Sequence, residues 1–298
     1  MSLLLILFII EKKMKISVVL PAYNEEGSIE KLIEEIGNVL GKEVEVIVID
    51  DNSSDKTPEI ALRCGAKVIR NPYNMGNGAS IKRGLRTATN PIVVLMDADG
   101  QHSPSQIPRL IKEMDGVDMV IAERKGCYQR WWRRLANCIY NLLASYVSNV
   151  KIKDLTSGFR VVKKDKAMKF LYLLPNRFSY PSILTLAFIK FAYPIKFVPV
   201  EVLPRKEGKS KINLINDGFR FLIIIARIAV FFSPLKLFLP LSLFFFFCGC
   251  SYYLYTFFRF HRFTNMSALF FTTSVIIFML GLVSEQIVSL RMERVDSS

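Results

Sequence analysis

The sequence predicts an α/β domain, with a mostly parallel sheet wrapped by helices, followed by a C-terminal anchor of two transmembrane helices. Short apolar strands alternate with helical segments from Ile16 onward, and several of these strands end in acidic residues. Two apolar stretches near the C-terminus are each close to the roughly 20 residues that a helix needs to cross a bilayer. The chain is therefore expected to divide into a globular part and a membrane part.

The candidate strands are continuous apolar runs rather than alternating ones: ISVVLPAYN, VEVIVIDD, AKVIRN and PIVVLMDAD. Helical segments are expected between them, near Ser28 to Leu40, from Thr57 and from Gly78. Strands that are apolar throughout are buried on both faces, as in a parallel sheet with helices on both sides. We therefore expect a doubly wound, Rossmann-like domain over residues 14–216.

Residues 1–13 are an extension to which we assign no function. The segment from Met1 to Ile10 is apolar, but it is about half as long as a bilayer-spanning helix. It also lacks the basic leading region and the small-residue cleavage site of a signal peptide. A second methionine, Met14, directly precedes the first strand, so the sequence leaves open whether translation begins at Met1 or at Met14.

The charge of the chain indicates an anionic partner. Among 298 residues, 40 Lys and Arg stand against 26 Asp and Glu, which gives a net charge of +14. Nucleic acid, an acidic membrane surface and a phosphorylated substrate all fit this charge, and the apolar C-terminal third favours the last two. The five cysteines show no Cys-x-x-Cys spacing and there are only two histidines, so neither a zinc site nor a disulfide framework is expected.

The membrane part is predicted as a helical hairpin over residues 234–298, with spans at about 235–258 and 267–288 and a short tail. Residues 217–233 carry Arg220 and Arg227 among apolar residues, which is typical of an interfacial amphipathic helix. The alternative for the two spans is a pair of buried helices in a large soluble protein.

Basic residues favour one orientation of this hairpin. Lys and Arg are frequent between Arg205 and Lys236, before the first span, whereas the loop between the spans holds only Arg259 and Arg262. Because basic flanks stay on the cytoplasmic side, we expect a multi-pass membrane protein whose globular domain faces the cytoplasm.

A basic, aromatic segment at residues 124–150 is expected to lie at the membrane surface. Its later part has helical apolar spacing, and Trp131 and Trp132 stand at its start. A basic amphipathic helix with tryptophans at one end is typical of a lipid headgroup region. The alternative is an ordinary helix that faces the core and has a solvated basic end.

Acidic and polar residues follow three of the predicted strands: Tyr23 to Glu25, Asp50 with Asp51, and Asp97 with Asp99. In such sheets ligands bind beyond the carboxyl ends of the strands, so these residues are expected to share one pocket. Asp97 and Asp99 lie two residues apart, where side chains of an extended segment point the same way. Paired carboxylates bind hard cations such as Mg²⁺ or Mn²⁺, and Gln101 adds a further oxygen ligand beside Asp99.

Five motifs in order resemble the family 2 glycosyltransferases of GT-A fold: PAYNEE, IDDNSSDKT, NMGNGASIKRGL, MDADGQHSP and LTSGFR. The match runs from about Ile16 to Lys211. With the later RKEGKSK and the paired apolar spans, the chain is most similar to polyprenyl-phosphate glycosyltransferases, such as dolichyl-phosphate mannose synthase and undecaprenyl-phosphate sugar transferases.

The resemblance implies roles for individual residues. It implies catalytic roles for Asp97, Asp99 and Arg205, and a metal site at Asp99 and Gln101. It places the acceptor phosphate at Arg124, Arg133 and Arg134, without deciding between the last two. The residues implied for the nucleotide-sugar are Pro21, Tyr23, Glu25, Ile49, Asp51, Asp97, Ala98, Asp99, Arg124, Arg205 and Lys211.

The reaction that the resemblance implies is metal-dependent, inverting transfer of one sugar from a nucleotide-sugar to a polyprenyl phosphate. GDP-mannose and UDP-glucose remain alternatives for the donor, and dolichyl and undecaprenyl phosphate for the acceptor. A membrane-bound transferase that acts on a glycolipid hydroxyl is a second reading, and a non-catalytic membrane scaffold of the same fold is a third. No nucleic acid partner is expected, and the sequence fixes neither protein partners nor oligomeric state.

Overall fold

The computed structural model describes residues 15–41, 43–125, 131–176, 180–202, 230 and 232–296; within these, the side chains of residues 125, 131–137, 291, 292 and 294–296 are not described. It forms two compact units. The first comprises Met1–Leu142 and Val150–Asn213, and the second comprises Leu143–Asn149 and Leu214–Ser298. Residues 1–13 and most of the predicted interfacial helix 217–233 lie outside the described residues.

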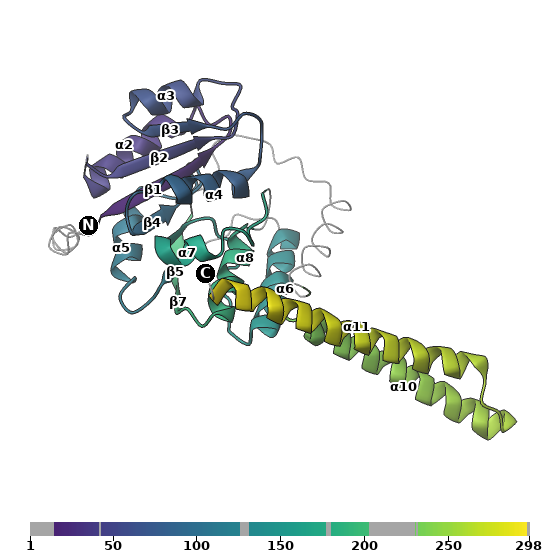
Figure 1. The fold of residues 1–298 in the computed structure, drawn as a ribbon. Coiled ribbons are helices and arrows are strands. Elements are labelled where there is room, and N and C mark those ends of the chain that lie inside the picture. The colour runs from purple at the N-terminus through teal and green to yellow at the C-terminus, as the bar shows by residue number, and fades with distance from the viewer. Residues whose placement is uncertain are drawn as a thin grey trace. The chain divides into compact units, whose positions relative to one another are not determined.

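A single seven-stranded sheet with the order β3-β2-β1-β4-β6-β5-β7 runs through the first unit (Figure 1). Strand β6 is antiparallel to β4 and β5, and every other neighbouring pair is parallel. The predicted mostly parallel α/β fold is therefore confirmed. The strands are β1 (Ile16–Ala22), β2 (Glu45–Asp50), β3 (Lys67–Arg70), β4 (Ile92–Leu95), β5 (Met119–Lys125), β6 (Arg160–Lys163) and β7 (Ile195–Glu201).

The helices of the first unit connect these strands, and those predicted before β4 lie where the sequence placed them. They are α2 (Ile29–Leu40), α3 (Thr57–Arg63), α4 (Asn77–Thr87), η1 (Pro104–Gln106), α5 (Ile107–Lys112), α6 (Trp131–Ser148), α7 (Lys164–Lys169) and α8 (Tyr180–Lys190). The last turns of α6 belong to the second unit.

Helices cover both faces of the sheet, as the apolar strands require. Val18 and Leu20 of β1 are fully buried in a core that also holds Ile29 and Ile33 of α2. Val19, which points the other way, packs on Gly84 of α4, where an added Cβ would lie 2.2 Å from a Val19 methyl carbon. The absent side chain at this position lets α4 approach the sheet closely.

The loops at the carboxyl ends of β1, β2 and β4 are tied to one another. The backbone N–H of Asn24 donates to Ser53 Oγ at 3.0 Å, and that of Ser54 donates to Asn24 Oδ1 at 2.8 Å. Ser28 Oγ donates to the carbonyl of Ala98 at 2.7 Å. Asn24 has a left-handed backbone (φ 56°), a conformation that asparagine tolerates better than most residues. These bonds draw the three predicted polar strand ends into one region.

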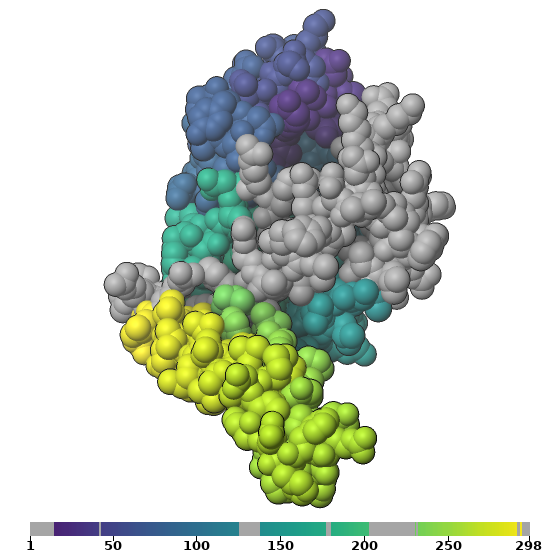
Figure 2. All heavy atoms as spheres, turned by 90° about the vertical axis from the view of Figure 1, so that its right-hand side faces the viewer, coloured from purple at the N-terminus to yellow at the C-terminus, as the bar shows by residue number. Residues whose placement is uncertain are grey.

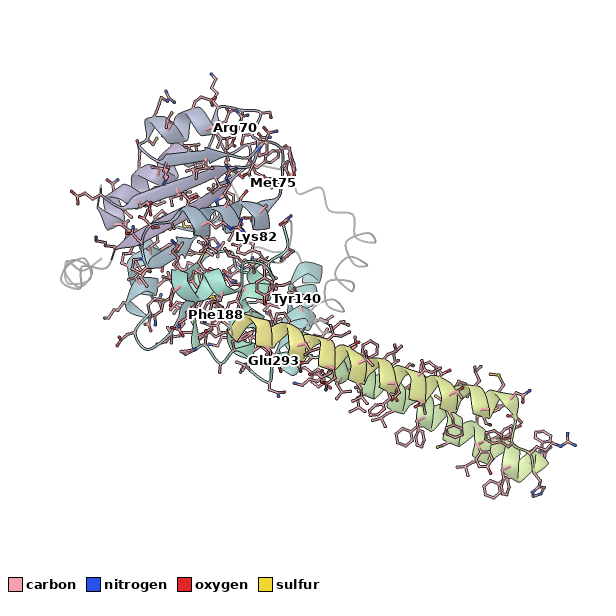
Figure 3. The ribbon with its side chains drawn as sticks, viewed as in Figure 1. Arg70, Met75, Lys82, Tyr140, Phe188 and Glu293 are labelled. Carbon is pink, nitrogen blue, oxygen red and sulfur yellow. The ribbon has the colours of Figure 1, made fainter. Side chains whose placement is uncertain are left out.

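The second unit is built on two long helices, α10 (Pro234–Phe260) and α11 (Asn265–Asp296). They pack side by side in the space-filling view, where α10 is light green and α11 yellow (Figure 2). Both are long and apolar enough to cross a membrane, and only 11% and 17% of their most apolar windows are buried. Large apolar side chains project outward along the hairpin (Figure 3). The predicted spans lie within these helices.

Small residues at intervals of seven form the seam between α10 and α11. Ser242 Oγ donates to the carbonyl of Ser274, and Ser274 Oγ donates to the carbonyl of Ser242, both at 2.9 Å. Such reciprocal bonds satisfy polar groups inside an apolar hairpin, and small side chains allow close packing. The buried residues of the seam are Ser242, Gly249 and Thr256 on α10, and Ser267, Ser274, Gly281 and Val288 on α11.

Candidate active site

Asp97 and Asp99 directly follow β4, at the carboxyl edge of the sheet. Burial and the neighbouring carboxylate of Asp99 raise the pKa of Asp97. The side-chain amide of Asn77, at the start of α4, opposes this shift by donating to Asp97 Oδ1 at 3.2 Å. Two carboxylates in one partly buried site repel each other, so a cation beside them is expected to be stabilising.

The donor groups around Asp99 fit a divalent cation. The backbone N–H of Gln101 donates to Asp99 Oδ1 at 3.1 Å, which places Gln101 in a tight turn after the acid. The Gln101 side chain makes no hydrogen bond with any other described residue, so its amide oxygen is available. No group of three His, Cys, Asp or Glu that could hold a metal occurs among the described residues. Gln101 and a bound phosphate could supply oxygen ligands beside Asp99.

His102 follows Gln101 in this turn and is buried. Its ring packs against Phe159 at 5.1 Å between centroids. Burial lowers the pKa of His102 to about 4, despite the nearby negative charge of Asp99. The imidazole is therefore neutral at pH 7, and within the described part of the chain its Nδ1 has no hydrogen-bond partner.

Arg124, at the end of β5, is held by a residue that the sequence analysis missed. Its Nε donates to Asp154 Oδ2 at 2.8 Å and its Nη2 to Asp154 Oδ1 at 2.9 Å. Burial alone would raise the pKa of Asp154, but these bonds and the charge of Arg124 outweigh burial, so the pKa is lowered. A bidentate pair fixes the plane of the guanidinium, and Asp154 therefore orients Arg124. The only sequence signal was an acid just before the LTSGFR motif.

The LTSGFR motif forms a turn in which Gly158 lies very close to the carboxylate of Asp97. A Cβ added at Gly158 would lie 2.5 Å from Asp97 Oδ2. Arg160 is fully buried beneath the turn and donates to the carbonyls of Ser157 (3.1 Å from Nε) and Pro181 (2.9 Å from Nη1). Burial lowers the pKa of Arg160 to about 10, so the side chain still carries its charge at neutral pH. The motif thus shapes the acidic site.

Asp51 is buried and clamps the loop that leads into α4. Its Oδ1 accepts hydrogen bonds from Asn71 Nδ2 and the Met75 backbone, and its Oδ2 accepts one from the Gly76 backbone, all at 2.8 Å. Figure 3 shows Met75 at the same end of the sheet as Arg70, the last residue of β3. Because Asn77 follows this loop, Asp51 helps to set the position of the amide that reaches Asp97. A direct contact of Asp51 with the donor stays a prediction.

Replacing Asp51 with asparagine is expected to loosen this loop. An amide in place of the carboxylate weakens three hydrogen bonds to a charged acceptor, so we expect a loss of about 1–3 kcal/mol in the free energy of unfolding. The donor KM should rise as well. Thermal unfolding and donor titration measure the two effects, with Asp165→Asn on the exposed side of α7 as the control. Unchanged values for Asp51→Asn would show that the clamp is unimportant.

The other predicted site residues have different surroundings. Tyr23 is exposed, whereas Ile49 is fully buried within β2 and can offer only its backbone. The Glu25 backbone N–H donates to Thr57 Oγ1 at 2.8 Å, which fixes the loop after β1. Pro21 and Ala98 lie at the same edge of the sheet. Arg205 and Lys211 lie outside the described residues, and Arg133 and Arg134 lie on α6 with side chains that are not described.

Two family models match the chain. Residues 17–171 match the model described as "Glycosyl transferase family 2", and residues 233–290 match the "GtrB C-terminal hairpin". The first covers the strands and loops that carry Asp51, Asp97, Asp99, Arg124 and Asp154, and the second covers α10 and α11 up to Leu290.

Two curated relatives are similar over about two-thirds of the chain. A dolichol-phosphate mannosyltransferase of Pyrococcus furiosus is 33% identical, over 67% of this chain and 60% of the relative. An undecaprenyl-phosphate 4-deoxy-4-formamido-L-arabinose transferase of Edwardsiella ictaluri is 30% identical, over 67% of this chain and 64% of the relative. The matched region is therefore less than two-thirds of the length of either relative.

Among solved structures, glucosyl-3-phosphoglycerate synthase from Mycobacterium tuberculosis has a similar fold. Its complex with Mn²⁺ and UDP-glucose aligns with a TM-score of 0.57 and 26% sequence identity, over 74% of this chain and 79% of that one. The synthase therefore binds a divalent cation and a nucleotide-sugar on the fold that the present chain shares.

Proposed function

The chain belongs to glycosyl transferase family 2, and from this premise we propose that it transfers one sugar from a nucleotide-sugar to a polyprenyl phosphate at a membrane surface. The observation that carries the proposal is the combination, in one chain, of the paired acids Asp97 and Asp99 with the apolar hairpin of α10 and α11. The names of the two curated relatives, one a dolichol-phosphate and the other an undecaprenyl-phosphate transferase, support the same class of acceptor.

The chemistry of this acceptor suits the residues that the site offers. A phosphate monoester has a second pKa near 6, so at neutral pH it is already largely ionised and needs no base to become a nucleophile. Its oxygen forms a bond to the anomeric carbon while the bond from that carbon to the nucleoside diphosphate breaks. The enzyme mainly has to bring two anions together, which requires cationic groups on both sides.

On the donor side, Asp99 and Gln101 are the residues that would hold a Mg²⁺ or Mn²⁺ ion. When bound, this ion neutralises the charge that develops on the departing diphosphate. Asp97 is held between Asn77 and the Gly158 turn, and we assign it to orientation of the donor at the same edge. Arg205 and Lys211 are proposed to contact the diphosphate from the following loop.

On the acceptor side, Arg124 is the described cation that we assign to the phosphate. Asp154 holds its guanidinium in one plane through two hydrogen bonds, and Thr156 Oγ1 accepts a further one from Nη2, so the side chain is ordered before a phosphate binds and little conformational entropy is lost on binding. Arg133 and Arg134 on α6 are proposed as further contacts. Inversion at the anomeric carbon follows from a single displacement and gives a β-linked product from an α-linked donor.

The hairpin explains how such an acceptor is reached. A polyprenyl phosphate carries its phosphate at the bilayer surface, so an enzyme that acts on it must be kept there. We propose that α10 and α11 span the membrane and that the catalytic domain faces the cytoplasm, where the donor is available. The excess of basic residues before α10 supports this orientation.

The test is a transfer assay with the purified full-length chain in detergent. The protein is incubated with Mg²⁺ or Mn²⁺, undecaprenyl or dolichyl phosphate, and a panel of labelled nucleotide-sugars that includes GDP-mannose and UDP-glucose. We expect label from one donor to enter the lipid phase. Transfer to a glycolipid hydroxyl, with none to either polyprenyl phosphate, would overturn the proposed acceptor.

A further inference from the structure

The last turns of α6 and the first turn of α10 are joined by one lysine. Lys236 Nζ donates to the carbonyls of Tyr146 and Val147, both at 2.9 Å, and to Asn149 Oδ1 at 2.7 Å. All four residues belong to the second unit, with the hairpin. Carbonyls at the end of a helix have no partner within the helix and carry partial negative charge, so an ammonium is favourable there. Lys236 therefore acts as the C-terminal cap of α6.

A charged residue also caps the start of α10. Glu285, on α11, accepts a hydrogen bond from the backbone N–H of Leu235 at 3.1 Å through its Oε2. Carboxylates are stabilising at helix N-termini for the same electrostatic reason. The start of α10 is thus bonded to α11 through Glu285 and to α6 through Lys236. Both bonds use ionisable groups. Placing such groups in the hydrocarbon core of a bilayer costs free energy, whereas the headgroup region accommodates them.

Helix α6 has an exposed apolar stripe. Ile139, Leu142 and Tyr146 are exposed, and their spacing places them on one side of the helix, where Lys236 Nζ lies 5.6 Å from the centroid of the Tyr146 ring. The opposite side is buried and includes Tyr140, whose hydroxyl donates to Ser182 Oγ at 2.9 Å. A helix with one side packed on its protein and an apolar stripe left exposed, joined at its end to an apolar hairpin, is suited to contact lipid along that stripe.

We propose that Lys236 is a positioning residue that holds α6 at the membrane surface with this stripe toward the lipid. The helix carries Arg133 and Arg134, so its depth sets the level at which the acceptor phosphate is bound. This inference rests on the proposed function, because it concerns the acceptor of that same reaction. The occupant of the stripe is bilayer lipid, since the stripe continues into the contact that Lys236 makes with the first apolar helix.

The chain contains its own probe for the depth of α6. Its two tryptophans, Trp131 and Trp132, both lie in this helix. In nanodiscs of brominated lipid, we expect their fluorescence to be quenched in the wild-type protein, and Lys236→Met to lose about half of that quenching. Lys236→Arg keeps a cation and should behave as wild type. Arg259→Met, which removes an exposed cation near the other end of α10, is the matched control.

Kinetics give a second readout. With Lys236→Met, we expect the KM for a long-chain polyprenyl phosphate to rise about tenfold, because α6 no longer presents it at a fixed depth. The donor KM and the rate with a water-soluble, short-chain prenyl phosphate should stay unchanged, which also shows that the variant is folded. Lys236→Arg should restore the long-chain KM.

Each result separates the inference from the proposed function. If Lys236→Met has wild-type quenching and a wild-type long-chain KM, or if the wild-type tryptophans are not quenched at all, the positioning role is wrong. If the wild-type protein transfers sugar to no polyprenyl phosphate, the proposed function fails, whatever the quenching shows.

Discussion

Replacing Asp99 with alanine is expected to lower kcat/KM for sugar transfer by about a thousandfold or more, because Asp99 is the carboxylate that we propose to hold the cation at the departing diphosphate. Asp99 lies in a loop turn, where its Oδ1 accepts only the backbone N–H of Gln101 among the hydrogen bonds of the described residues. The variant should therefore fold normally. Transfer of label into the lipid phase measures the activity, and thermal unfolding checks the fold.

A measurement of cation binding distinguishes a metal-binding role of Asp99 from a purely structural one. The electron paramagnetic resonance signal of free Mn²⁺ should fall when wild-type protein and nucleoside diphosphate are added, and should fall much less with Asp99→Ala. Asp165→Ala, which removes an exposed acid on α7, is the control. Wild-type transfer or unchanged Mn²⁺ binding in Asp99→Ala would show that the cation is held elsewhere.

The second large effect is expected from Gly158→Ala. The new methyl group would lie 2.5 Å from Asp97 Oδ2, closer than non-bonded atoms allow, so the carboxylate has to move. A displacement of about 1 Å in a reacting constellation can cost about a hundredfold in rate, and we expect kcat/KM to fall by at least that factor. Because only the end of a side chain has to move, the midpoint of thermal unfolding should change little.

The matched control is Gly37→Ala in α2, where an added Cβ meets nothing within 4 Å. This substitution should leave the activity unchanged and should stabilise the helix slightly, since alanine has a higher helix propensity than glycine. Equal activity of both variants would show that Asp97 can shift without consequence, and would remove Asp97 from the catalytic group.

The sequence was sufficient for the first half of the sheet because each strand there is a continuous apolar run that ends in a polar motif. Strands β1, β2 and β4 and the helices between them follow local rules of burial and turn chemistry. The later half depends on pairing over long distances. The short strand β6 is antiparallel between β4 and β5, and nothing in Arg160–Lys163 itself specifies these partners.

The site shows the same division. Asp97 and Asp99 were found because two acids after a strand are a local pattern. Asp154 was missed because its partner Arg124 is 30 residues away, and a single acid in a loop is unremarkable. Arg160 was missed because an arginine is normally exposed, whereas here backbone carbonyls compensate for its burial.

The seam between α10 and α11 has a consequence for how such enzymes can change their donor sugar in evolution. Ser242 and Ser274 satisfy each other, and Gly249 and Gly281 each face side chains of the other helix, so these contacts between α10 and α11 all lie within the hairpin. Substitutions that change the donor pocket leave this pairing intact. The same anchor can therefore be retained while the attached domain becomes specific for a new sugar. We expect the seven-residue spacing of the seam to change more slowly in evolution than the sequences of the loops around Asp97.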